Sequence, residues 1–143
     1  MKTITISRQY GSGGKTIGYM LAEKLGIPCY SREILQRASE ESGINESMFN
    51  ARDERLKRLP KFLLSTNVYS GELLPPESKE FTSDQNLFNY EAEIIKKYAA
   101  EGSCVLIGRC ADFVLKDDPD MISVYVHADH DFQMKSALER VSM

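Results

Sequence analysis

The sequence reads Gly11-Ser12-Gly13-Gly14-Lys15-Thr16 between a β-branched segment and a segment of helical periodicity. Residues 2–7 are rich in Thr and Ile, which favours a strand. From residue 14 to residue 25 apolar side chains recur at helical spacing, and Gly26 follows where a helix C-terminus favours glycine. Residues 11–16, called the glycine-rich loop below, are therefore predicted to join a strand to a helix.

Glycines in such a loop would bring the backbone close to an anion, because they adopt positive φ and carry no Cβ. The N–H groups would converge on phosphate oxygens at the positive end of the helix. Lys15 would neutralise charge on a transferred phosphoryl group, and the Thr16 hydroxyl would bind Mg²⁺. The pattern G-x-x-x-x-G-K-[ST] matches at residues 14–16, although Gln9 replaces its first glycine. The prediction is a phosphate-binding loop; the alternative is a turn that binds no ligand.

Strand and helix patterns alternate along the rest of the chain. Strands are predicted at residues 27–30, 104–107 and 122–126, and helices at 32–42, 46–59, 84–101 and 129–142, with a short helix ending at Leu115. The runs at 104–107 and 122–126 are apolar enough for buried strands. Residues 60–83 hold several Pro, Gly, Ser and Thr, which predicts a long connection that is mobile or functional.

Alternating strands and helices predict an α/β fold with a parallel sheet and right-handed crossovers. Residues 1–143 are expected to form a single domain. Ligands in such sheets bind at the carboxyl ends of the strands. The turns after Ser7, Tyr30, Ile107 and Val126 are therefore the places to look for a site.

Composition narrows the class of protein. The hydrophobic share of 42% and the charged share of 27% are those of a globular protein. A net charge of -3 does not favour nucleic acid or an anionic membrane as a partner. The chain contains no apolar run of about 18 residues that would span a bilayer. Three cysteines without C-x-x-C spacing indicate reduced thiols in a cytoplasmic protein.

Two charged features leave alternatives open. The run at residues 52–58 mixes both signs, which predicts a solvated helix face or, alternatively, a basic rim near a phosphate site. Arg8 would pair either with a phosphate or with an acidic side chain.

Three blocks of the sequence, at residues 6–14, 25–35 and 105–112, resemble the cytidylate-kinase-like family. The resemblance implies a P-loop fold of three layers, with helices on both faces of a parallel sheet. It also implies ATP-dependent phosphotransfer to a nucleoside monophosphate, most naturally CMP, with Mg²⁺. The glycine-rich loop would hold the donor phosphates, and Ser31, Arg37 and Arg109 would contact the acceptor. An arginine suits a phosphate because its planar fork binds two oxygens.

The sequence departs from the family at several positions. Gly14, rather than Lys15, falls where cytidylate kinases have their lysine. Ile107 and Cys110 occupy positions of aspartates, and Asp112 is the nearest replacement. These departures leave two other functions open: a phosphate-binding module without catalysis, or a kinase of another small acceptor.

The C-terminal end of the sequence raises a further expectation. Relatives continue past the last helix with an arginine-bearing lid, a fifth strand and a closing helix, so this chain alone is expected to be a poor kinase. The strand at 121–127 is expected beside the first strand, with an open apolar edge that allows a homodimer.

Overall fold

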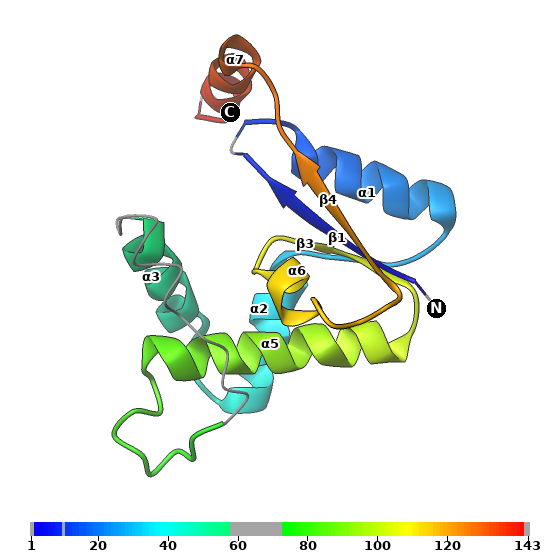
Figure 1. Ribbon diagram of the computed structural model, residues 1–143. Coiled ribbons are helices and arrows are strands. Elements are labelled where there is room, and N and C mark those ends of the chain that lie inside the picture. The colour runs from blue at the N-terminus through cyan, green and yellow to red at the C-terminus, as the bar shows by residue number, and fades with distance from the viewer. Residues whose placement is uncertain (1, 10, 58–72, 142–143) are drawn as a thin grey trace. The chain divides into compact units, whose positions relative to one another are not determined.

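The computed structural model describes residues 2–9, 11–57 and 73–141, and Figure 1 shows its helices and strands. The elements are β1 (Thr3–Arg8), α1 (Gly14–Leu25), β2 (Cys29–Tyr30), α2 (Arg32–Ser42), α3 (Glu46–Lys57), α5 (Asp84–Glu101), β3 (Cys104–Ile107), α6 (Ala111–Val114), β4 (Met121–Val126) and α7 (His130–Val141). This order confirms the predicted alternation. Residues 58–72, which include the end of the predicted helix 46–59 and the first part of the predicted connection 60–83, lie outside the described residues; residues 73–83 form turns before α5.

Contacts between Cα atoms divide the chain into two compact units. The first comprises Met1–Ser31 and Tyr98–Met143, and the second comprises Arg32–Lys97. The first unit holds the whole sheet and the glycine-rich loop, so it carries the predicted donor site. The single-domain expectation stays a prediction.

The sheet has four parallel strands in the order β2-β3-β1-β4. Strand β1 pairs with β3 from Thr3↔Cys104 to Ile6↔Ile107, and with β4 from Thr3↔Met121 to Arg8↔Val126. The predicted α/β fold with a parallel sheet is therefore confirmed, and so is the position of β4 beside β1.

Side chains of the strands alternate between the two faces of this sheet. Ile4 and Ile6 of β1 and Val105 and Ile107 of β3 form one buried cluster with Ala22 of α1. This cluster fixes α1 against the sheet, and with it the loop that precedes the helix.

On the opposite face, Tyr30 of β2 stacks on Tyr98, with ring centroids 3.7 Å apart. The Cys104 thiol lies 3.9 Å from the Tyr98 carbonyl on the same side of the sheet. Side chains of the first unit therefore pack on both faces of the sheet.

Strand β4 occupies one edge of the sheet. Ile122 is 48% exposed and Tyr125 is 60% exposed, so the expectation of a buried strand is wrong for β4. The physical reason is its place in the strand order, because among the described residues β4 pairs on one side, with β1. The homodimer through this edge stays a prediction.

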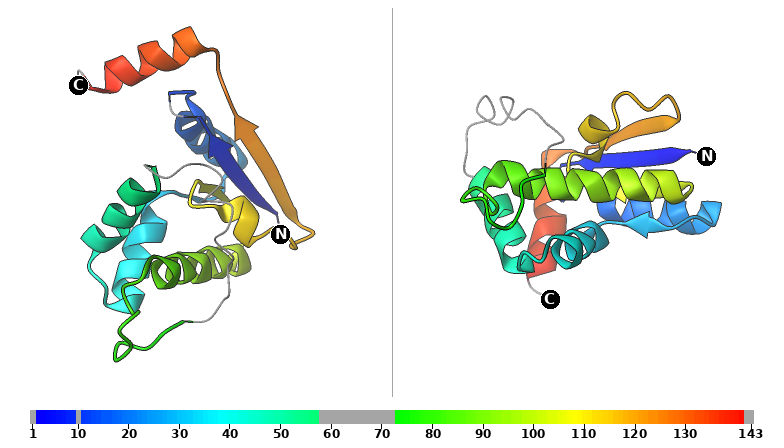
Figure 2. Two further views of the ribbon diagram at one scale, coloured as in Figure 1. Left: turned by 60° about the vertical axis from the view of Figure 1, so that its left-hand side comes forward. Right: turned by 90° about the horizontal axis from the view of Figure 1, so that it is seen from below.

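In the second unit, α2 and α3 pack side by side (Figure 2). Arg52 of α3 is 7% exposed, and its Nη1 lies 3.4 Å from Oε2 of the buried Glu91 on α5. The expectation of a solvated face is wrong for Arg52, and so is the basic rim, because the ion pair with Glu91 draws the arginine into the interior. The side chains of residues 53–58 lie outside the description.

The buried Cys104 predicts a loss of stability at high pH. Burial raises the pKa of this thiol from an ordinary 9.0 to about 11. The unfolded chain therefore loses the proton first, and stability that is complete below pH 9 falls as the pH rises towards 11, by about 2–3 kcal/mol. Denaturant unfolding across this window should show the loss in the wild type and in Cys110→Ala, whose thiol is exposed. The same slope in Cys104→Ala would contradict the assignment.

Candidate phosphate-binding site

The strand order brings the turns that follow the strands together at one edge of the sheet. Along this edge lie Ser31 after β2, Gly108 after β3, the glycine-rich loop after β1, and His127 after β4. Because β1 is between β3 and β4, the loop has the Gly108 turn as its neighbour on one side. The arrangement is that of a parallel sheet with its site at the carboxyl edge.

The backbone of the loop has the conformation that its glycines predict. Gly11 and Gly13 have φ of 78° and 83°, in the left-handed region where other residues are strained. The Ser12 amide donates to the Gln9 carbonyl at 3.1 Å, and the Gly14 amide donates to the Ser12 hydroxyl at 3.3 Å. Two of the loop amides thus hold the loop in shape.

Other amides of the loop remain in position to meet a ligand. The first bond of the α1 ladder runs from the Ile17 amide to the Gly13 carbonyl at 3.0 Å, so the amides of Lys15 and Thr16 precede the ladder. A Cβ added at Gly13 would meet no atom within 4 Å, which leaves its backbone open to an approaching group. The loop therefore fits a phosphate group, which binds at a helix N-terminus through exposed amides.

The turn after β3 is strained. Gly108, Arg109 and Cys110 have φ of 72°, 57° and 58°, and the last two are non-glycine residues in the left-handed region. The Gly108 amide donates to the Ile6 carbonyl at 2.9 Å and ties the turn to β1. Such conformations cost about 1–2 kcal/mol per residue and gather at functional sites. The strain supports Arg109 as a site residue.

Relief of this strain is measurable. We expect Cys110→Gly to raise the free energy of unfolding by about 1 kcal/mol, because glycine adopts φ of 58° without a steric penalty. Denaturant titration checks the value. Cys29→Gly in β2 serves as the control and should lower stability, since a strand residue gains nothing from glycine. Destabilisation by Cys110→Gly would show that the Cys110 side chain stabilises the turn.

Arg8 crosses this edge from the loop to the strained turn. A Cβ added at Gly14 would lie 2.6 Å from the Arg8 Cβ and 3.0 Å from its Cδ, and a Cβ added at Gly108 would lie 3.0 Å from its Nη1. The guanidinium therefore reaches the turn while its stem covers the start of α1. Sequence reasoning left the role of Arg8 open, and only the fold shows that residues 14 and 108 lie on either side of it.

Gln9 connects the loop to the segment after β4. Its Oε1 accepts from the Ala128 amide at 3.4 Å and from Gln133 Nε2 at 2.8 Å. The Asp129 carboxylate accepts from the Phe132 amide at 2.8 Å and caps α7. The residue that replaces the first glycine of the phosphate-loop pattern thus fixes the start of α7.

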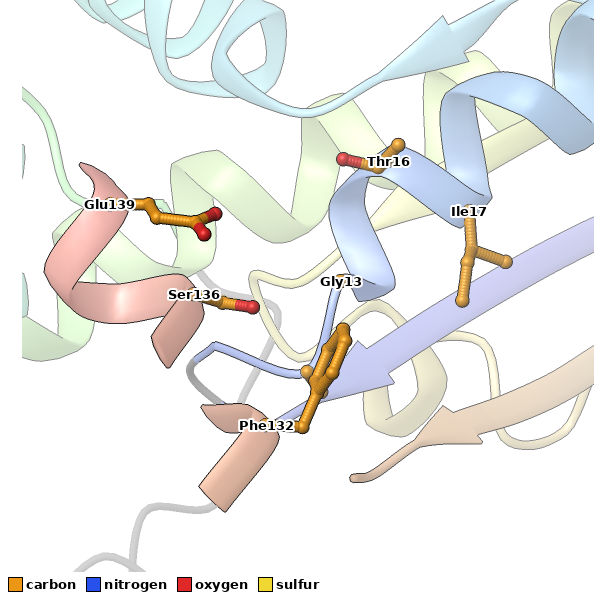
Figure 3. A pocket seen from close by; sticks show the side chains of 7 residues that line it. Gly13, Thr16, Ile17, Phe132, Ser136 and Glu139 are labelled. Atoms are coloured by element: carbon orange, nitrogen blue, oxygen red, sulfur yellow. The ribbon is translucent and has the colours of Figure 1, made fainter. Parts of the chain in front are cut away.

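A pocket of about 420 Å³ lies between the loop and α7 (Figure 3). One wall is formed by Ser12, Gly13, Thr16 and Ile17, and the other by Phe132, Ser136 and Glu139. The sequence pattern indicated Ser12, Gly13 and Thr16 as site residues but gave no sign of the α7 wall, because helical periodicity does not tell which element a helix faces. Phe132 is 49% exposed and presents an aromatic ring to the pocket.

The predicted acceptor residues belong to both units. Ser31 is half-buried at the end of β2, and Asp112 is in the first turn of α6, two residues beyond the strained turn. Arg37 belongs to the second unit, where its Nε donates to Glu41 Oε1 at 3.3 Å. Ile107, which the family resemblance aligns with an aspartate, is 1% exposed and packs in the core against α1. The acceptor roles stay predictions.

The described residues contain neither a cluster of metal-ligating side chains nor a helix that could span a membrane. No three His, Cys, Asp or Glu side chains in this part of the chain lie close enough to hold a metal ion. Mg²⁺ commonly needs fewer protein ligands, because phosphate oxygens and water complete its shell, so the exposed Thr16 hydroxyl fits one position. None of the described helices is both long and apolar enough to cross a bilayer.

The fold and the loop define a class: α/β proteins whose first parallel strand leads through a glycine-rich turn into a helix at the carboxyl edge. Comparison with family models gives the family. The model of the cytidylate kinase-like family matches residues 3–143, and the chain belongs to that family. Membership associates the chain with kinase-like, nucleotide-using proteins.

Comparison with individual proteins adds the fold of a relative. No curated protein matches the sequence. A crystal structure of an uncharacterized protein from Eubacterium ventriosum matches 100% of this chain with 26% sequence identity and a TM-score of 0.63. The chain spans 63% of the length of that protein.

Proposed function

We propose that the protein transfers a phosphoryl group from ATP to a nucleoside monophosphate, with CMP as the first acceptor to test. One observation carries the proposal. The glycine-rich loop, with left-handed Gly11 and Gly13, is next to the strained turn at Arg109 on neighbouring strands. Membership of the cytidylate kinase-like family supports nucleotides as the substrates.

Each part of the site has a role in this reaction. Amides of the loop and the N-terminus of α1 would bind the donor phosphates, and Lys15 would add positive charge there. Arg109 would bind the acceptor phosphate with its planar fork. The Thr16 hydroxyl would hold Mg²⁺, which supplies charge neutralisation on the phosphates when bound. A monophosphate is already an anion at neutral pH, so the chain needs no general base to activate it.

A coupled assay of ADP release tests the proposal. The full-length protein is incubated with MgATP and each nucleoside monophosphate in turn, and turnover with CMP or another monophosphate is expected. Arg109→Ala should weaken the acceptor step while MgATP affinity, measured by calorimetry, stays within about twofold of wild type. The absence of turnover with every monophosphate would contradict the proposal.

One observation favours a second acceptor class. Ile107, which the family resemblance aligns with an aspartate, is buried in the core, so this position offers no carboxylate to the acceptor. A kinase of another small molecule, or a phosphate-binding module without catalysis, would fit the same loop. Calorimetry with ATP and CMP separates the nucleotide acceptor from these two alternatives. Binding of CMP supports the nucleotide acceptor, and binding of ATP without CMP supports one of the alternatives.

A further inference from the structure

The phosphate-loop pattern places its first glycine six residues before its lysine. In the register of the family resemblance, Gly14 occupies the lysine position, and six residues earlier stands Arg8. The usual arrangement is therefore reversed. Position 8, where the pattern has glycine, carries the arginine side chain, and position 14, where the pattern has lysine, carries no side chain. We propose that Arg8 provides on the donor triphosphate the positive charge that a phosphate-loop lysine ordinarily provides. This inference rests on the proposed function and deepens it.

The two exchanged positions are in contact. A Cβ added at Gly14 would be 2.6 Å from the Arg8 Cβ, closer than carbon atoms of two side chains approach. The stem of Arg8 thus fills the space that the stem of a lysine at position 14 would need. A side chain fits at one of these positions and excludes one at the other.

The guanidinium of Arg8 lies where the proposed transfer needs positive charge. Nη1 lies 3.0 Å from the position of a Cβ added at Gly108, so the guanidinium reaches the turn of the neighbouring strand. This turn carries Arg109, the predicted acceptor residue, while the stem of Arg8 contacts the start of the loop helix. The guanidinium is therefore between the donor and acceptor ends of the proposed transfer. Its charge is permanent and its fork binds two phosphate oxygens.

Lys15 occupies a different position on the helix. One residue along an α-helix turns the side chain by about 100°, so Lys15 leaves α1 in another direction from a side chain at position 14. Lys15 is half-buried and is not among the residues that line the pocket at Thr16. We expect Arg8 to contribute more than Lys15 to binding of the triphosphate.

Titration calorimetry with MgATP tests the inference on the full-length protein. We expect Arg8→Gln to weaken binding about tenfold or more, and Arg8→Lys to weaken it less, because the charge remains. Lys15→Gln should have a smaller effect than Arg8→Gln. Lys24→Gln, which removes the same charge from the far end of α1, is the control and should stay within about twofold of wild type.

The exchange of positions gives a sharper test. Gly14→Lys in the presence of Arg8 should lower both thermal stability and MgATP affinity, because the two stems overlap. In Arg8→Gly/Gly14→Lys the lysine has room, and we expect the affinity to return to within about threefold of wild type. A double-mutant cycle measures this coupling.

Three results would overturn the inference. Wild-type affinity in Arg8→Gln would show that the guanidinium does not touch the triphosphate. An equal effect of Gly14→Lys with and without Arg8 would show that the positions do not exchange. A wild-type protein that binds no MgATP would remove the proposed function itself, whereas the first two results leave that function standing.

Discussion

Arg52→Met is expected to lower the free energy of unfolding by about 3–5 kcal/mol, because it removes the guanidinium that pairs with the buried Glu91 carboxylate. The two side chains are 9% and 2% exposed, so water cannot replace the lost charge. Arg52 also donates from Nε to the Asp84 carbonyl at 3.0 Å and lies 5.3 Å from the Phe88 ring centroid. Denaturant titration measures the loss.

The same unit offers a matched control. Arg32 pairs with Glu46 at 3.6 Å, but its side chain is 73% exposed, and Arg32→Met should cost less than about 1 kcal/mol. Arg52→Met/Glu91→Leu should recover part of the loss, because no buried charge is then left unpaired. Equal costs at Arg52 and Arg32 would contradict the argument from burial.

Gly11→Ala is expected to reduce turnover about 100-fold, since a displacement near 1 Å in a phosphate loop has effects of that size. An alanine Cβ would overlap the backbone carbonyl of Gln133 on α7, which has no flexible end to move aside. The left-handed φ of 78° adds strain of about 1–2 kcal/mol. Both effects would move the loop that is proposed to hold the triphosphate.

Gly26→Ala is the control for Gly11→Ala, because it introduces the same backbone strain without displacing a neighbouring segment. Gly26 has φ of 67°, and an added Cβ there would meet nothing within 4 Å. This variant should lose about 1 kcal/mol of stability and keep its turnover. Equal turnover in Gly11→Ala and the wild type would show that the loop position does not matter to the reaction.

The sequence was sufficient for the elements and their order. Strongly periodic segments such as α5, capped by Ser83 and followed by Gly102, have local signals at both ends, and the structure confirms them. The position of β4 beside β1 came from the resemblance rather than from local pattern. Its exposed edge did not follow from its apolar composition, because a run of apolar residues has the same appearance in a central strand and in an edge strand.

The site was only partly predictable. Glycine at positions 11 and 13 predicts the positive φ observed there, since little else requires glycine at such a turn. The left-handed Arg109 and Cys110 gave no such signal, because neither residue type favours that conformation. The buried Arg52 and the contact of Arg8 with residues 14 and 108 both depend on partners distant in sequence. Charge patterns describe one element at a time and do not identify such partners.

The pairing of β1 has a consequence for synthesis on the ribosome. Both partners of this strand lie about 100 or more residues later in the chain, so their loop closure is entropically costly and slow. At roughly 5–20 residues per second, β1 emerges several seconds before β3 and β4 exist. During that interval the Ile and Thr residues of β1 have no native neighbour in the sheet, and the contact of Arg8 with the Gly108 turn cannot form.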